Sequence, residues 1–250
     1  LVGLQPQNLE DVIALISLYR PGPMDSIPTY LRNRHEPDKI SYKTPQLAHI
    51  LDVTNGCIVY QEQVMQIFRE LAGFSFGQAD NVRRAMSKKK HAVMEAEREH
   101  FVHGCTEPGH ECPGCVANGI SEEVANEIYD EMSSFASYAF NKSHAACYAY
   151  VAFQTAYLKC HYPSEFMAAL LTSVLDNTDK VIEYSGECAR LGLKVLPPDV
   201  NISNGGFTAD NGKIRFGLNA VKNVGRNLIE RVVEERKEEP YSSLYDFCKR

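Results

Sequence analysis

The segment IVYQEQVMQIFRELAGF, residues 58–74, decides the fold class of this chain of 250 residues. After two β-branched residues the pattern changes to helical spacing, because apolar residues recur at intervals of three, four and seven. They are Val64, Ile67, Phe68 and Leu71. The spacing predicts a helix from about Gln61 to Ala72 that stops at Gly73.

Helical patterns continue on both sides of this segment. They predict helices over residues 9–19, from about Gln78, from Ser121 to about residue 135, and over 143–161. The proline-rich, basic stretch 24–45 predicts an ordered, loop-rich connection, and the Gly-, Pro- and Cys-rich stretch 103–119 excludes a helix. Beyond residue 172, FTADNGKIRFG predicts a β-hairpin over Asn211 and Gly212. The chain is therefore predicted to be mainly α, with a small α+β part at its end.

Composition places the chain among folded globular proteins, with 44% hydrophobic and 23% charged residues. No stretch approaches the roughly 20 apolar residues that cross a bilayer, and no signal peptide is evident, so the expected compartment is the cytoplasm. There the eight cysteines are expected to stay reduced. The chain begins with Leu1 inside an amphipathic pattern, which favours a segment of a longer protein.

The net charge of −6 hides two opposite regions. Between Glu95 and Glu131 ten acids face one base, Arg98, whereas between Asp80 and His91 five bases face one acid. The acidic total therefore does not exclude a site for anions.

The first candidate anion site is DNVRRAMSKKK, residues 80–90. On a helix, spacings of three and four align a basic stripe opposite the apolar residues. The stripe contains Arg84, Ser87, Lys88 and His91, and the apolar residues are Val82, Ala85 and Met86. Two interpretations stay open, a solvated helix face and a surface that binds phosphates.

The second candidate is FNKSHAACYAY, residues 140–150, where Asn141 or Ser143 can cap a helix. Free backbone amides at such an end attract anions, with Lys142 and His144 beside them. The alternative is an ordinary helix start in which His144 is packed. Farther along this helix four residues share a face. They either stack on a base or pack in the core, and packing in the core is favoured for most of them. They are Tyr150, Gln154, Tyr157 and His161.

The third candidate is GLNAVKNVGRNLIERVV, residues 217–233, which resembles a helix-hairpin-helix whose turn amides contact backbone phosphate. Lys222 and Arg226 favour DNA over the alternative, an ordinary tight helical hairpin. The second helix is expected to bury four apolar side chains. They are Leu228, Ile229, Val232 and Val233.

The segment HGCTEPGHECPGCVANG, residues 103–119, has the ligand types of a closed, structural zinc site. Cys105, Cys112 and Cys115 supply three thiols, and His110 or His103 the fourth ligand. The alternative is a flexible loop with reduced thiols, and the tight CPGC knuckle disfavours an open, catalytic zinc site. The other cysteines are interpreted as small buried residues. They are Cys57, Cys147, Cys160, Cys188 and Cys248.

Six ordered blocks together resemble the bacterial replicative DNA polymerase III alpha subunits, the C-family polymerases. The blocks are RPGP (20–23), YQEQVMQI (60–67), RRAMSKKK (83–90), FNKSHAACYA (140–149), YPSEFMAALLTS (162–173) and AVKNVG (220–225). The resemblance implies the end of a palm at 1–19, fingers at 20–172 and a helix-hairpin-helix domain at 173–250. It implies a DNA-directed DNA polymerase, a nucleotidyltransferase, whose partners are primer–template DNA, dNTP, a sliding clamp and other replisome subunits, with no membrane.

The resemblance also implies roles for residues. Those expected at the nucleotide and template are Arg20, Arg83, Arg84, Lys88, Lys142, Ser143, His144 and Gln154. Those expected at the DNA backbone are Lys222, Asn223, Gly225 and Arg226. The family's palm holds two Mg²⁺ ions with three aspartates; Asp11 is assigned as the third, against a helix-capping or solvent-facing acid. The paired aspartates are absent here, so the fragment alone is expected to be inactive. The rival interpretation is a non-catalytic, zinc-containing helical module that binds DNA.

Overall fold

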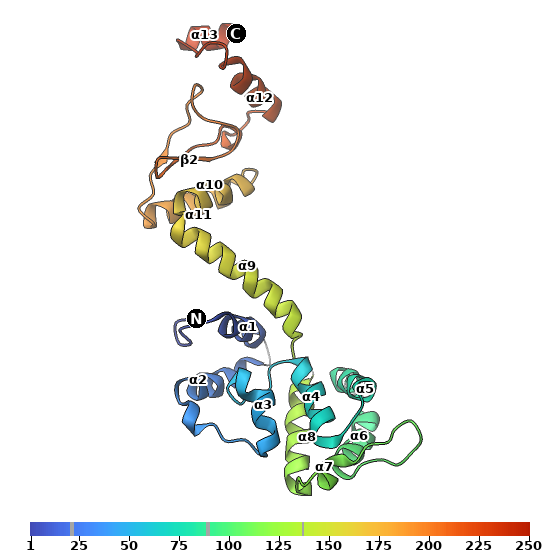
Figure 1. The fold of residues 1–250 in the computed structure, drawn as a ribbon. Helices are drawn as coiled ribbons and strands as arrows, with labels where there is room; N and C mark the ends of the chain where they lie inside the picture. Colours follow the sequence, from blue (N-terminus) through green and yellow to red (C-terminus); the bar gives the residue numbers. More distant parts are fainter. Residues whose placement is uncertain (21–22, 89–90, 137) are drawn as a thin grey trace. The chain divides into compact units, whose positions relative to one another are not determined.

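The computed structural model describes residues 1–20, 23–88, 91–136 and 138–250 (Figure 1). It divides into two compact units, Leu1–Val151 and Ala152–Arg250, which are described separately below. Lys89 and Lys90 of the predicted basic segment lie outside the described residues, as do Pro21 and Gly22 of the RPGP block.

The first unit is a cluster of helices. Its elements are α1 (Leu9–Leu18), η1 (Pro23–Ser26), α2 (Ile27–His35), η2 (Pro37–Lys39), η3 (Pro45–Leu47), α3 (Ala48–Leu51), η4 (Asp52–Thr54), α4 (Gln61–Ala72), α5 (Phe76–Ser87), α6 (His91–His103), α7 (Gly114–Ala117), α8 (Glu122–Ala136) and the first half of α9 (Lys142–His161). Helices α4 and α8 run through its middle, with α2 and α3 on one side and α5, α6 and α7 on the other (Figure 1).

Helix α4 forms where the apolar spacing predicted it, and it carries the core. Its four spaced apolar side chains are fully buried, and the ring of Phe68 packs against Phe101 and Tyr129 at centroid distances of 5.0 and 6.0 Å. Gly73 ends the helix in the left-handed region at φ 74°, a conformation that costs glycine little. Helix α5 begins at Phe76, two residues before the predicted start, because Ser75 and Gln78 form a capping box.

Short helices form in the stretch predicted to be loop-rich, 24–45, and in the stretch predicted to exclude a helix, 103–119. Within 24–45 the chain forms α2, because Pro28 lies in the first turn of that helix, where no amide hydrogen is needed. Within 103–119 the chain forms the short α7. It starts at Gly114, which has φ +79° and sits against Gly104; a Cβ on Gly114 would lie 2.3 Å from the Gly104 nitrogen. The glycines thus allow a close backbone approach rather than a flexible loop.

The second unit combines helices with a small sheet. Its elements are the second half of α9, α10 (Pro163–Ser173), α11 (Thr178–Arg190), β1 (Val195–Leu196), β2 (Thr208–Asp210), β3 (Lys213–Arg215), η5 (Leu218–Ala220), α12 (Arg226–Glu235) and α13 (Leu244–Lys249). The strand order is β1-β3-β2, with β1 parallel and β2 antiparallel to β3. The hairpin turns over Asn211 and Gly212 as predicted, both at positive φ. Helix α10 packs on this sheet, and the core around Met167, Leu171 and Ile214 is fully buried.

The predicted fold class, a helical part followed by a small α+β part, is confirmed. The two units divide within α9, whereas the predicted boundary was near residue 173. The difference arises because α10 packs against β2, β3 and α11. The end of α10 at Ser173 therefore does not mark the edge of a compact unit, and the assignment of palm, fingers and helix-hairpin-helix parts stays a prediction.

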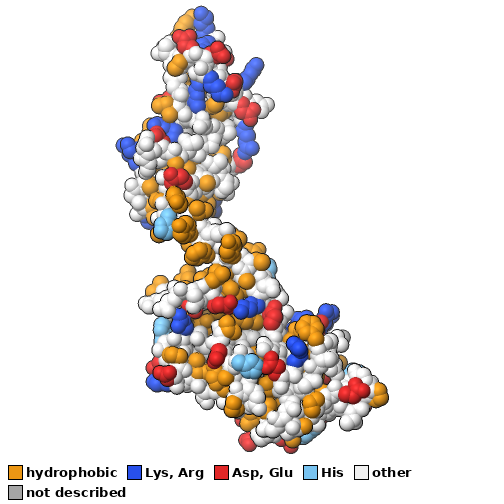
Figure 2. All heavy atoms as spheres, in the orientation of Figure 1, with side chains coloured by type: hydrophobic (Ala, Val, Ile, Leu, Met, Phe, Trp, Pro, Cys, Tyr) orange, Lys and Arg blue, Asp and Glu red, His pale blue; other side chains and the backbone are white. Residues whose placement is uncertain are grey.

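Helix α9 differs most from its prediction. Figure 2 shows hydrophobic side chains gathered over it, and Tyr150 and Tyr157 are 57% and 48% exposed, so the predicted core role is wrong within the described residues. The rings of Tyr157 and His161 pack on each other, with centroids 4.3 Å apart. Among the scattered cysteines, Cys57 and Cys188 are buried as predicted. Contrary to the prediction, Cys147, Cys160 and Cys248 are exposed.

Candidate phosphate and nucleic-acid site

The two basic segments singled out in the sequence meet at one pocket of the first unit, named here the α4–α5 pocket. Its volume is about 480 Å³. It is lined by Gln61, Glu62, Met65, Gln66, Arg69, Glu70, Phe76, Asp80, Arg83 and Asn141. Arg83 belongs to DNVRRAMSKKK and Asn141 to FNKSHAACYAY, so residues about 60 positions apart in sequence share one wall.

A short backbone bridge brings the start of α9 to the start of α4. The Phe140 N–H donates to the Val59 carbonyl at 3.2 Å, and the Gln61 N–H donates to the Phe140 carbonyl at 3.0 Å. The Arg20 guanidinium lies over the Phe140 ring, 4.4 Å from its centroid. Arg20 and the start of α9, both predicted to lie at the nucleotide and template, therefore meet at this bridge.

On α5 an acid holds the arginines. The Asp80 carboxylate pairs with Arg83 at 2.7 Å and with Arg84 at 2.8 Å, and Arg83 also donates to the Gln61 side chain at 3.0 Å. The hydrogen bond from Arg83 lowers the pKa of Asp80 below its ordinary value. The opposite face is buried as predicted, through Val82, Ala85 and Met86. Lys88 is exposed, and the side chains of Ser87 and His91 lie outside the described residues.

At the start of α9 a carboxylate occupies the position predicted for an anion. Asn141 is the cap, because its side chain accepts from the His144 N–H at 2.9 Å. The Glu62 carboxylate accepts from the Lys142 N–H at 3.1 Å and from the Asn141 side chain at 2.8 Å. A helix N-terminus attracts negative charge, and here Glu62 supplies it.

The side chains of this helix start have partners of their own. The Lys142 ammonium pairs with Glu10 at 3.0 Å, and the His144 ring packs between Phe140 and Tyr148. Ser143 is exposed. Gln154 belongs to the second unit, so the geometry of the first unit does not include it.

The α4–α5 pocket is lined by two bases and three acids, a balance of −1. Sequence reasoning found Arg83 and the neighbouring Lys142 but missed Arg69 and the acids of this region. These acids are Glu62, Asp80 and Glu10. The pairing of Asp80 could have been predicted from the sequence, because Asp80 lies three and four residues before the two arginines. The contact of Glu62 could not, because its partner Lys142 is 80 positions away.

Asp11 lies in the first turn of α1 and is 5% exposed. Its carboxylate pairs with Arg34 at 3.2 Å and accepts from the Gln7 N–H at 2.9 Å. Its own N–H donates to the capping side chain of Asn8. These contacts are those of a helix-start acid, and its role as a metal ligand stays a prediction.

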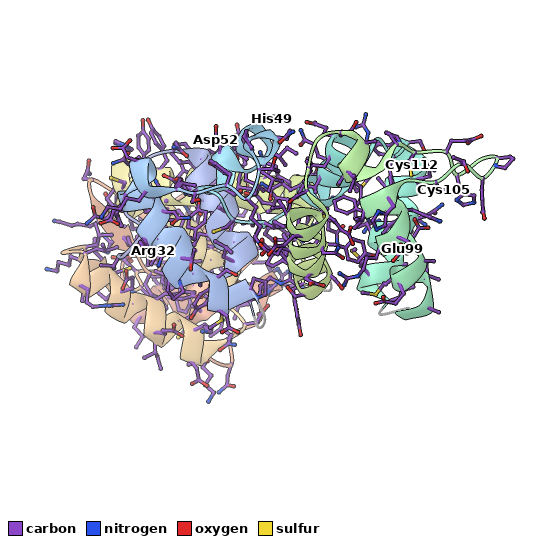
Figure 3. All side chains as sticks on the ribbon, turned by 90° about the horizontal axis from the view of Figure 1, so that it is seen from below. Arg32, His49, Asp52, Glu99, Cys105 and Cys112 are labelled. Atoms are coloured by element: carbon purple, nitrogen blue, oxygen red, sulfur yellow. The ribbon has the colours of Figure 1, made fainter. Side chains whose placement is uncertain are left out.

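The cysteine segment forms a tight loop. Cys105 and Cys112 exchange two backbone hydrogen bonds of 2.9 Å and lie side by side at its base (Figure 3). Cys115 is fully buried, and burial raises the pKa of its thiol to about 12. His110 is exposed at the tip of the loop, while His103 lies near Glu99 and Glu122.

The described geometry does not fit the predicted zinc site. The Cys112 thiol donates to the His100 carbonyl, with sulfur and oxygen 3.6 Å apart, and burial raises its pKa. Zinc binding would require these thiols to lose their protons. Within the described residues, no three His, Cys, Asp or Glu side chains are grouped to hold a metal ion. Zinc therefore stays a prediction, which metal analysis of the purified protein tests.

The predicted helix-hairpin-helix turn lies between η5 and α12. Asn223 adopts φ +66°, Gly225 precedes the first residue of α12, and Lys222 is exposed. Arg226 pairs with Asp176 at 2.6 Å. Leu228, predicted to be buried with Ile229 and Val232, is instead 53% exposed and lines an apolar groove of about 330 Å³. Within the described residues, no helix is both long and apolar enough to span a bilayer.

Known proteins resemble this chain along its whole length. The family described as bacterial DNA polymerase III alpha subunit finger domain matches residues 1–109, and a helix-hairpin-helix motif matches residues 192–250. The DNA polymerase III subunit alpha of Thermus aquaticus is 50% identical over 99% of this chain and 20% of its own length. That of Bacillus subtilis is 45% identical over 98% of this chain and 21% of its own length. The chain thus spans about a fifth of these relatives.

Proposed function

The chain belongs to the family of bacterial DNA polymerase III alpha subunits, and from this premise we propose that it forms the fingers and helix-hairpin-helix parts of a DNA-directed DNA polymerase. The observation that carries the proposal is the α4–α5 pocket, which joins Arg83 to the start of α9. A pocket with guanidinium groups beside a helix N-terminus suits a triphosphate.

The triphosphate would enter by exchanging with carboxylates. Its oxygens accept the same hydrogen bonds that Glu62 accepts from Lys142 and Asn141, and they attract Arg83 as Asp80 does. Arg84, which is 65% exposed, and the exposed Lys88 extend the cationic edge toward the templating strand. The chain's own contribution is therefore to bind and orient phosphate groups.

Two Mg²⁺ ions would supply the activation of the primer hydroxyl and the stabilisation of the leaving phosphate. In this proposal two of the metal-binding aspartates would lie outside this chain, and the third would be Asp11. In that role the Asp11 carboxylate must release Arg34, so Arg34 would be the residue that positions it in the absence of metal.

The second unit would hold the DNA backbone. The turn that carries Lys222, Asn223 and Gly225 presents backbone amides without reading bases, and Arg226 adds a charge once it leaves Asp176. In this proposal the enzyme works in the cytoplasm with primer–template DNA, a sliding clamp and other replisome subunits.

Arg83→Ala and Lys142→Ala in the full-length polymerase test the proposal. Arg83→Ala removes a guanidinium, and Lys142→Ala removes an ammonium group that a triphosphate would take over from Glu10. Each is a charged contact worth about 1.5–3 kcal/mol, so the KM for dNTP should rise at least tenfold while primer–template affinity stays near that of the wild type. Lys180→Ala, an exposed cation of the second unit, is the control. An unchanged KM combined with weaker, salt-sensitive DNA binding would overturn the proposal and favour a non-catalytic DNA-binding module.

A further inference from the structure

A second polar pocket lies in the first unit, at helix α2, and is named here the α2 pocket. Its volume is about 340 Å³. It is lined by Thr29, Arg32, Asn33, Lys39, Ser41, Tyr42, Lys43, Leu47, Leu51, Gly56 and Glu131. Figure 3 labels Arg32 on α2, far along the unit from Cys105 and Cys112. This pocket shares no lining residue with the α4–α5 pocket.

The charge of its lining favours an anion. Arg32, Lys39 and Lys43 face a single acid, Glu131, which gives a balance of +2. The α4–α5 pocket has a balance of −1 on the same basis. Hydroxyl groups of Thr29 and Ser41 lie among the bases, and such groups donate hydrogen bonds to phosphate oxygens.

Arg32 is the free cation of this pocket. Its guanidinium forms no ion pair or hydrogen bond with any residue that the structure describes, whereas Arg34, two residues on, is bound to Asp11. Lys39 pairs with Glu36 at 3.1 Å, but both side chains are largely exposed. Exposed pairs contribute about 0–1 kcal/mol, so a phosphate can displace Glu36. Lys43 pairs with Glu127 at 3.3 Å and with Glu131 at 3.5 Å, so two acids already hold its ammonium group.

The pocket has a fixed floor. The Asn33 side chain donates to the Asn55 carbonyl at 2.7 Å, which holds α2 to a turn in which Asn55 and Gly56 both have positive φ. A Cβ on Gly56 would lie 2.7 Å from Ile40. The Tyr42 hydroxyl donates to Asp52 at 2.6 Å. These contacts fix the backbone around the pocket, so its shape is set by the fold and not only by flexible surface side chains.

The adjoining hollow limits where an anion can lie. It shares Thr29, Gly56 and Glu131 with the α2 pocket and adds the carboxyl group of Asp25. It also contains Cys57, whose pKa burial raises to about 11, so the thiol there carries no charge and is no nucleophile. An anion is therefore kept at the end formed by Arg32 and Lys39, away from Glu131 and its partner Lys43.

We propose that the α2 pocket binds a phosphate group of a nucleic-acid strand through Arg32 and Lys39. The inference rests on the proposed function, because a polymerase supplies such a strand, but it assigns a contact separate from the nucleotide. A strand phosphate is favoured over a nucleotide because Arg32 and Lys39 are exposed side chains on two different elements, α2 and η2, and exposed bases of this kind contact the phosphates of a strand.

Arg32→Ala and Lys39→Ala in the full-length polymerase test this inference, with Arg190→Ala, an exposed cation of the second unit, as the control. Primer–template affinity should fall three- to tenfold at low salt. The slope of log affinity against log salt should become shallower by about one, while the KM for dNTP stays unchanged. Thermal unfolding checks that the variants are folded. Affinities and slopes equal to those of Arg190→Ala would overturn the inference.

A second arm identifies the source of the phosphate. Inorganic pyrophosphate is titrated into wild type and Arg32→Ala by calorimetry. Loss of pyrophosphate binding with unchanged DNA affinity would assign the pocket to a free phosphate compound and overturn the strand contact. If Arg83→Ala changes the KM for dNTP while Arg32→Ala leaves primer–template affinity unchanged, this inference is wrong and the proposed function is unaffected.

Discussion

The two polar pockets of the first unit have opposite charge although both were formed from basic stretches of sequence. DNVRRAMSKKK carries five bases, yet the α4–α5 pocket beside it has a lining balance of −1. The α2 pocket, formed in part by the proline-rich stretch 24–45 with its scattered bases, has +2. The charge of a pocket therefore depends on which acids the fold brings in, more than on how many bases a segment contains.

The acids of the two pockets also differ in how firmly they are held. The Asp80–Arg83 pair has side chains only 23% and 18% exposed, whereas Lys39 and Glu36 are 74% and 44% exposed. A ligand of the α4–α5 pocket must exchange with a carboxylate, while one of the α2 pocket meets a free guanidinium. This difference predicts a selective nucleotide site and a permissive strand site.

Phe68→Ala should disrupt both pockets at once, because both depend on one hydrophobic core. Phe68 belongs to the same buried cluster as Leu47 and Leu51, which line the α2 pocket. Truncating a buried Phe costs about 3–5 kcal/mol, to be measured by chemical denaturation. Phe76→Ala, in the α4–α5 pocket and 65% exposed, should change stability by less than about 0.5 kcal/mol. Similar losses in both variants would contradict the core assignment.

Glu62→Gln should bring the two pockets closer in charge. The amide keeps a carbonyl that can accept from Lys142 but removes one negative charge, so dNTP should bind the full-length polymerase about three- to tenfold more tightly by calorimetry. Glu70→Gln removes the same charge from the pocket lining away from α9 and should have a smaller effect. Equal gains would mean that only the total charge matters, not the position at the helix start.

Asp80→Asn should show how much the ion pairs of Asp80 stabilise the α4–α5 pocket at each pH. The folded-state pKa of Asp80 is lowered, so its stabilising contribution is present above the ordinary carboxyl pKa and is lost as pH falls through the lowered value. At pH 7 the variant should be about 0.5–1 kcal/mol less stable, and the difference should shrink as the pH approaches 3. Thermal unfolding at several pH values measures it; a difference independent of pH would contradict the ion pair.

The sequence predicted what depends on neighbours along the chain. Helix α4 follows from apolar spacing and a glycine stop, and the hairpin from Asn211 and Gly212, because these signals act within a few residues. Contacts across long separations escaped prediction. Glu62 reaches Lys142 across 80 positions, and Glu10 reaches it across a still longer stretch.

Burial was also predicted unevenly. The apolar face of α5 was predicted correctly because polar and apolar residues alternate along it at helical spacing. On α9 apolar residues occur on all sides, so spacing could not show which of them the chain covers, and Tyr150 and Tyr157 proved exposed. The burial of Leu228 was predicted wrongly for a related reason, because α12 faces a groove that the described residues leave open.

The close approach of Gly104 and Gly114 has a practical consequence. Their backbones meet so tightly that the chain between them leaves and re-enters the helical cluster at a single point, while residues 106–111 are exposed. Such a stem isolates its tip mechanically from the rest of the molecule. A fluorophore or a short affinity tag grafted between Glu107 and Glu111 would thus label the protein while leaving both pockets untouched.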